Sequence, residues 1–138
     1  KDSRKAITPG LQITLSAPSP NAIYEIGNGT SVVNVSARNT GNITLTNIRL
    51  TQGNALCATT LAPGASTQCP NYIYSAPGLG APNPAPVNVS ASGTVTINPA
   101  TEKFANLPAT FTPNGANSGT ITANSSVPIT IMRIKLPV

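Results

Sequence analysis

The strongest constraint on the fold is the alternation of apolar and polar residues at every second position. It is clearest at residues 33–37 and 43–46, where each segment has one apolar and one polar face. Residues 39–42, Asn-Thr-Gly-Asn, are typical of a tight reversal, so we predict that the two segments pair as a hairpin. No stretch has helical periodicity, and turn signals recur about every eight to twelve positions. These patterns predict an all-β sandwich.

The alternation breaks after Leu45, because the next apolar residues are Ile48 and Leu50. A shift of this kind predicts a β-bulge near Thr46 and Asn47 that resets the facing of the strand.

Two cysteines, Cys57 and Cys69, flank the turn sequence Leu-Ala-Pro-Gly at 61–64. Pro and Gly at the two corner positions favour a type II turn. We expect a disulfide between the cysteines, which would stabilise the fold by about 3 kcal/mol through its effect on the unfolded chain. Such a bond indicates an oxidising compartment.

Further alternating segments continue the pattern on both sides. They are residues 11–15, 23–26, 72–74, 86–98 with a shift at Gly93, 109–112, 120–123 and 127–136. Residues 1–9 are interpreted as a basic arm or linker, and residues 10–138 as one β-sandwich domain. The proline-rich segment 75–86 is either a crossover between sheets or a module for glycosylation on hydroxyproline.

Composition narrows the class of protein. Only 8 % of the 138 residues are charged, yet no apolar run approaches the roughly 20 residues of a spanning helix, so we expect no membrane span. The net charge of +5 is scattered, and three Tyr, two Phe and no Trp leave few stacking partners for bases. Nucleic acid is therefore not expected as a partner.

The central segment resembles a known family. Residues 39–48 (NTGNITLTNI), then Cys57, then residues 61–69 (LAPGASTQC) are similar to the immunoglobulin-like repeat of large bacterial, archaeal and algal surface proteins, as in mastigonemes and adhesins. The likeness covers residues 11–97 at most and is sharp only between Arg38 and Cys69. It implies a secreted immunoglobulin-like sandwich with a structural or adhesive role and no catalytic residues. The last third of the chain would add extra strands.

Five Asn-X-Ser/Thr acceptor patterns support export. They begin at Asn28, Asn34, Asn42, Asn88 and Asn124. We expect covalent glycans on at least one of them and an extracellular, cell-surface location.

The chain has few side chains of the types that enzymes use for catalysis. The chain has no His, and its acidic residues are Asp2, Glu25 and Glu102. Glu25 with Glu102 is the one carboxylate pair left for glycoside hydrolysis. We expect no enzyme activity, no cofactor and no metal site.

The predicted function is a building block of a glycosylated cell-surface fibre, appendage or wall, with copies of itself or neighbouring domains as partners. The apolar last segment either closes the chain's own sandwich or completes the sheet of another subunit. The candidate donor residues are Ile129, Ile131, Ile134 and Leu136.

The alternative function is an adhesin or carbohydrate-binding module that uses its loops, with Tyr24, Tyr72 and Tyr74 as the aromatic contacts. Threonines at 44–46 and 94–96 also fit an ice- or carbohydrate-binding ladder, although exposed strands favour Thr in any case.

Overall fold

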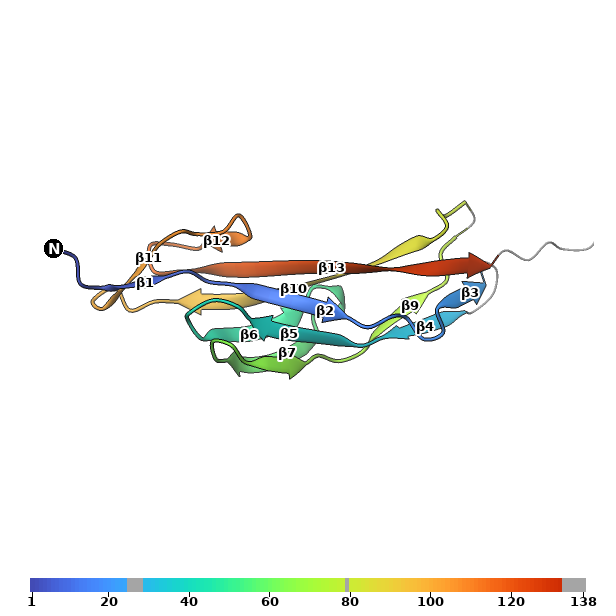
Figure 1. Cartoon of the computed structure of the whole chain (residues 1–138), viewed down its shortest axis with the longest axis horizontal. Coiled ribbons are helices and arrows are strands. Elements are labelled where there is room, and N and C mark those ends of the chain that lie inside the picture. The colour runs from blue at the N-terminus through green and yellow to red at the C-terminus, as the bar shows by residue number, and fades with distance from the viewer. Residues whose placement is uncertain (25–28, 79, 133–138) are drawn as a thin grey trace, which may run out of the picture.

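The computed structural model describes residues 1–24, 29–78 and 80–132. These residues form an elongated molecule built almost wholly of β-strands, with one short 3-10 helix at Gln52–Asn54. Figure 1 shows the N-terminus at one end and strand β13 (Ser118–Met132) running along the length to the other. The predicted all-β sandwich is confirmed.

The strands form two facing layers and two short ladders. One sheet has the order β12-β13-β10-β6-β7, with β3 also paired to β13, and the other has the order β2-β5-β8. Strands β1 and β11 form one ladder, and β4 and β9 the other. The bounds are β1 Lys5–Ile7, β2 Leu11–Leu15, β3 Ala22–Tyr24, β4 Thr30–Val33, β5 Val35–Asn39, β6 Leu45–Leu50, β7 Leu56–Leu61, β8 Ser66–Gln68, β9 Tyr72–Ser75, β10 Ala85–Thr96, β11 Glu102–Phe104 and β12 Phe111–Pro113.

Strands β10 and β13 form the longest ladder, with antiparallel pairs from Ala85 opposite Ile129 to Thr96 opposite Ser118. Every second residue of β10 from Ala85 to Val95 is buried, without interruption. The expected shift at Gly93 is therefore wrong, because Gly93 itself faces the core beside Ile48. The two strands expected at 120–123 and 127–136 are one continuous strand as far as Met132.

The apolar residues gather into two separate clusters along this ladder. The larger one, called the body core here, lies between the two layers and includes Ile13, Leu45, Ile48, Val89 and Ile121. The smaller one, called the distal core, consists of Ile23, Val33, Ala85, Val87, Ile129 and Ile131.

The predicted hairpin is wrong, although its strands exist. Strand β5 pairs with β2 and β8, whereas β6 pairs with β10 and β7 in the opposite layer. The chain therefore crosses between layers at residues 40–44. Asn39 stabilises this crossing, because its buried amide nitrogen donates to the carbonyls of Ile43 (2.7 Å) and Leu61 (2.8 Å). Alternation predicts which face of a strand is buried, but not which strand is its neighbour.

The predicted bulge in β6 is confirmed. Thr46 lies opposite Thr94 and Arg49 opposite Ser92, so β6 has one residue more than β10 between these pairs. Asn47 adopts a left-handed conformation there (φ 52°), which Asn tolerates better than most residues.

The first nine residues differ from the expected arm. Lys5–Ile7 forms β1, which pairs in parallel with β11, and Ile7 is completely buried. The basic residues led to the interpretation as an arm. Instead, the segment pairs with the edge of β11, and Ile7 packs in the body core.

The proline-rich segment serves as the expected crossover. Its residues 76–78 and 80–84 contribute no strand and link β9 to β10. The Asn83 side chain accepts from the Ile131 N–H (2.9 Å) and donates to its carbonyl (3.0 Å). The Asn83 side chain thus makes the two hydrogen bonds that a residue of a neighbouring strand would make, and it attaches the crossover to β13.

Candidate functional site

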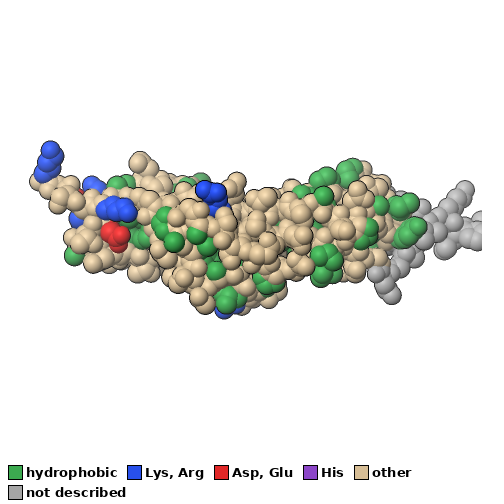
Figure 2. Space-filling model, turned by 60° about the horizontal axis from the view of Figure 1, so that its bottom comes forward, with side chains coloured by type: hydrophobic (Ala, Val, Ile, Leu, Met, Phe, Trp, Pro, Cys, Tyr) green, Lys and Arg blue, Asp and Glu red, His purple; other side chains and the backbone are tan. Residues whose placement is uncertain are grey.

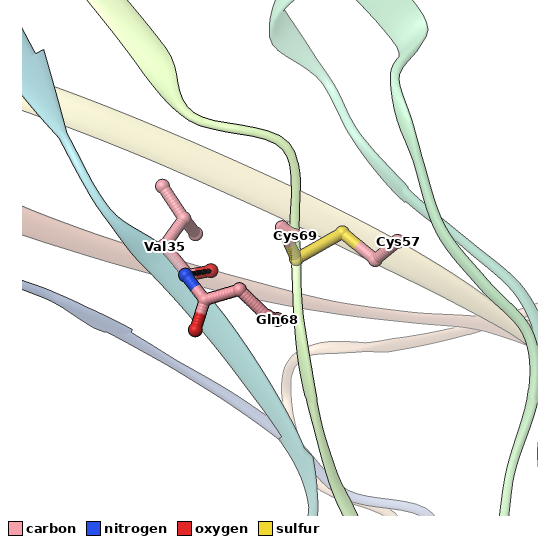
Figure 3. Close-up of a disulfide and its surroundings, with 4 residues drawn as sticks. All are labelled: Val35, Cys57, Gln68 and Cys69. Carbon is pink, nitrogen blue, oxygen red and sulfur yellow. Dashed lines mark hydrogen bonds between the residues drawn. A yellow bond between two sulfur atoms is a disulfide. The ribbon is translucent and has the colours of Figure 1, made fainter.

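The predicted disulfide joins the two layers of the sandwich. Cys57 and Cys69 are bonded, with Cα atoms 4.3 Å apart (Figure 3). Cys57 lies in β7 of the long sheet, and Cys69 follows β8 of the opposite layer. The carbonyl of Val35 in β5 accepts from the N–H of Cys69 (2.8 Å) and from the side chain of Gln68 (3.1 Å). The disulfide is thus anchored to the middle strand of the smaller sheet.

Asn39 connects the two crossings between the layers. The turn after β7 has Gly64 at φ 79° and an Ala65 N–H that donates to Ala62 (3.0 Å), as the predicted type II turn requires. The Gly64 N–H donates to the carbonyl of Asn39 (2.9 Å), and the Asn39 N–H donates to Ala65 (3.0 Å). One buried residue therefore holds both turns. The motif Asn-Thr-Gly-Asn was visible in the sequence, but this role was not.

Four of the five glycosylation candidates have exposed asparagines, and three of these, Asn34, Asn88 and Asn124, lie on strands or between them. Asn28 lies outside the described residues. Asn42 is also exposed, but its side chain accepts from the N–H of Thr8 (2.8 Å) and donates to the carbonyl of Ala6 (2.8 Å). It holds the first strand against the sandwich, so a sugar on its nitrogen would compete with the bond to Ala6.

Two of the acceptor patterns face each other across the long ladder. Asn88 lies opposite Ser126, and Asn124 lies opposite Ser90, whose hydroxyl donates to the Asn124 oxygen at 3.4 Å. A shallow hollow is lined by these four residues and Ser125. Both patterns are therefore on one outward surface, a relation that only the strand register reveals.

The candidate donor residues belong, where described, to the chain's own sandwich. Ile129 and Ile131 are buried in the distal core. Ile129 pairs with Ala85 of β10, and Ile131 pairs in parallel with Ile23 of β3. Ile134 and Leu136 lie outside the described residues.

Charged residues gather near the N-terminus. The Asp2 carboxylate accepts from the Arg4 guanidinium (3.0 Å) and lies 3.3 Å from the Lys103 ammonium. The bonds from Arg4 hold the pKa of this carboxyl well below its usual range, and Asp2 in turn raises the pKa of Arg4. Figure 2 shows charged side chains at this end and none on the opposite half of the same face.

The residues weighed for catalysis are not brought together. Glu102 accepts from the N–H of Asn98 (2.8 Å) near the N-terminal end, and Glu25 is outside the described residues. Among the residues that the structure describes, no three His, Cys, Asp or Glu side chains form a group that could hold a metal ion.

The tyrosines do not form one platform. Tyr72 and Tyr74 lie on one face of β9, as expected, and that face packs against the distal core. Tyr24 is half exposed and pairs with Met132 instead. No single surface presents all three rings to a sugar.

A row of threonines crosses the outer face of the long sheet. The register places Thr60 opposite Thr46, Thr46 opposite Thr94, Thr94 opposite Thr120, and Thr120 opposite Thr112. Directly paired residues share a face, so these five side chains, called the threonine row here, follow one another from β7 to β12. Alternation predicted outward threonines, but their alignment depends on the bulge in β6 and on strand order.

No helix among the described residues is long and apolar enough to cross a membrane. Comparisons with protein-family models, curated proteins and solved structures found no match to this chain.

Proposed function

We propose that this chain is a non-catalytic structural module of an extracellular assembly, a glycosylated surface fibre, appendage or wall. Its copies or neighbouring domains would be joined end to end. The observation that carries the proposal is that the first and the last strand of the described chain reach opposite ends of the molecule. Strand β1 lies at one pole of the elongated molecule, and β13 runs to the other (Figure 1). Neighbours attached at the two poles would extend the long axis.

The long ladder suits such a module mechanically. A pull along the long axis loads the pairs between β10 and β13 in shear, so many backbone hydrogen bonds resist together. The disulfide prevents β7 and the segment after β8 from separating. Both features would keep the module folded under tension.

The surface chemistry is consistent with an exported, glycosylated protein. Asn34, Asn88 and Asn124 are exposed, and the disulfide is typical of oxidising compartments. Strand exchange is a less direct route to a fibre, because β13 would have to leave both β10 and β3. We therefore favour joining through the poles over donation of the last strand.

The test is the mass and size of the native material, measured by size separation and intact mass spectrometry without reducing agent. We expect large assemblies, and masses above 14.0 kDa per chain in discrete sugar increments. A bare 14.0 kDa monomer would contradict the proposal. Mild separation of the assemblies by reagents that leave β-sheets folded would distinguish joined poles from exchanged strands.

A further inference from the structure

The threonine row presents a regular array of hydroxyl and methyl groups. Neighbouring strands lie about 4.8 Å apart, so the row, which crosses five strands, is roughly 19 Å long. Adjacent outward positions add more hydroxyls, since Ser92 lies opposite Thr122 and Thr96 opposite Ser118. Each hydroxyl can donate one hydrogen bond and accept others, and each threonine methyl offers a small apolar contact. This surface matches a ligand that alternates hydroxyl and C–H groups.

The same surface is poorly suited to two other classes of partner, polyanions and proteins. From Asn88 to Thr96 every outward residue of β10 is uncharged, and so are the residues opposite them on β13. Two cations lie beside the row. Arg49 already donates to the Asn47 side chain (2.8 Å) and to the Asn54 carbonyl (2.9 Å), and Lys5 shares the lining of a hollow with the carboxylate of Glu102. A polyanion would find little attraction here. Leu56, opposite Arg49, is exposed beside this array. A lone leucine does not form the apolar, aromatic-rich centre that is typical of protein interfaces.

A hollow beside the row breaks the flatness of the array. It has a volume of about 440 Å³, and its lining includes Thr44, Thr46 and Thr96 together with Lys5 and Glu102. This space admits a sugar ring or a branch, and its polar rim offers both donors and acceptors.

We propose that the outer face of the long sheet binds a neutral polysaccharide, which lies across the strands along the threonine row with one sugar unit over the hollow. The recognition would use the hydroxyls of Thr46 and Thr94 at the centre of the contact. The Thr46 hydroxyl would act as an acceptor, because its hydrogen is donated to the Thr94 carbonyl (3.5 Å). This binding is independent of end-to-end assembly, since it uses the side of the molecule and not its poles.

The test is co-sedimentation of the full chain with four insoluble neutral polysaccharides: a β-1,4-glucan, a β-1,3-glucan, chitin and a β-mannan. We expect binding to at least one, with equal affinity at low and high salt because the polysaccharide carries no charge. The double variant Thr46→Val/Thr94→Val keeps side-chain shape and strand preference but removes two hydroxyls. Its affinity should fall by about tenfold or more.

The matched control is Thr14→Val/Thr130→Val, which removes two exposed hydroxyls on strands β2 and β13 away from the row. It should bind as the unchanged protein does, and all variants should show the same circular dichroism. Absence of binding to all four polysaccharides would overturn the proposal. So would binding that salt abolishes, equal binding by the row variant, or inhibition of ice growth without polysaccharide binding. None of these outcomes bears on assembly through the poles.

Discussion

The two ends of the molecule are built on the same pair of strands but differ in how much apolar surface they bury. The body has two facing sheets, a disulfide and a core that extends from Ile7 to Ala123. The distal end has six core residues and two narrow pairings, β4 with β9 and β3 with β13. It also exposes four of the large apolar side chains, Tyr24, Val32, Ile73 and Met132. Two-stranded ladders are marginal alone, so the distal end depends on β10 and β13 extending from the body.

This difference implies an order of opening. Regions with few buried contacts open locally at a lower free energy than the core of a domain. The distal end should therefore exchange its amide hydrogens first, while the body retains its protection. Substitutions confined to one region should therefore differ in their effect on stability, with the largest losses in the body.

The largest effect is expected in the body core. Ile48 is completely buried between the layers, so Ile48→Ala removes apolar contacts and leaves a cavity. The free energy of unfolding should fall by about 3–4 kcal/mol, measured by urea denaturation. An exposed control, Thr59→Ala on β7, should change it by less than about 0.5 kcal/mol. A loss below about 1 kcal/mol for Ile48→Ala would contradict the assigned core.

The disulfide should come next. Replacing both cysteines by alanine, Cys57→Ala/Cys69→Ala, should lower the free energy of unfolding by about 3 kcal/mol, because the unfolded chain gains freedom. Thermal unfolding of the unchanged protein with and without a reducing agent provides an independent measurement. The double variant should no longer respond to the reducing agent. A continued response would show that the reagent acts elsewhere.

Asn39→Leu tests the connection between the two crossings. The substitution removes the two buried hydrogen bonds from the Asn39 amide to the carbonyls of Ile43 and Leu61, which should cost about 2–3 kcal/mol. Asn42→Leu is the comparison, since its bonds to Thr8 and Ala6 are exposed and it should cost about 1 kcal/mol or less. Equal losses from the two variants would mean that burial of Asn39 does not set its contribution.

In the distal end, Ile131→Ala should act locally. Hydrogen exchange should accelerate in β3, β4 and the end of β13, while protection in β6 and β7 remains near that of the unchanged protein. The global free energy of unfolding should fall by only about 1–2 kcal/mol, since the site has fewer neighbours to lose. Uniform acceleration across both regions would show that the molecule opens as one unit.

The smallest effect is expected from Asp2. Its pKa is lowered in the folded state, so its contribution is present above the ordinary pKa of 3.8 and is lost as the pH falls towards the lowered value. The first strand should then loosen in strong acid, which amide exchange at Lys5–Ile7 can measure. Asp2→Asn should show the same loosening at neutral pH and little further change in acid. Because Asp2 is exposed, global stability should scarcely respond.

Local patterns were sufficient for several parts of this structure. The strand at 11–15 has its predicted bounds, and the bulge at Asn47 and the turn at Gly64 have the expected conformations. Each of these depends on residues adjacent in the chain, whose backbone preferences and facing are encoded nearby. The disulfide also followed from two cysteines around one turn.

Other parts of the structure could not be predicted from residues adjacent in the chain. Ile7 was hidden within a basic segment, and its burial depends on β11, almost a hundred residues later. The partners of β5 and β6 depend on where β2, β8 and β10 lie, so the same turn sequence became a crossing between layers. The same holds for the candidate surface. The sequence predicted outward threonines on single strands, but their alignment depends on which strands are neighbours.

By itself, the sequence determined an all-β chain with its strand faces, its tight turns and its one disulfide, because these follow from side-chain period and local backbone preference. Only the tertiary structure decided which strands are neighbours, how Asn39 joins the two crossings, and that Thr46, Thr94 and Thr120 stand in line. These features depend on pairing between distant segments, and the hydrogen bonds of a β-ladder are the same for any pair of strands. The choice among partners is made by the packing of the whole sandwich.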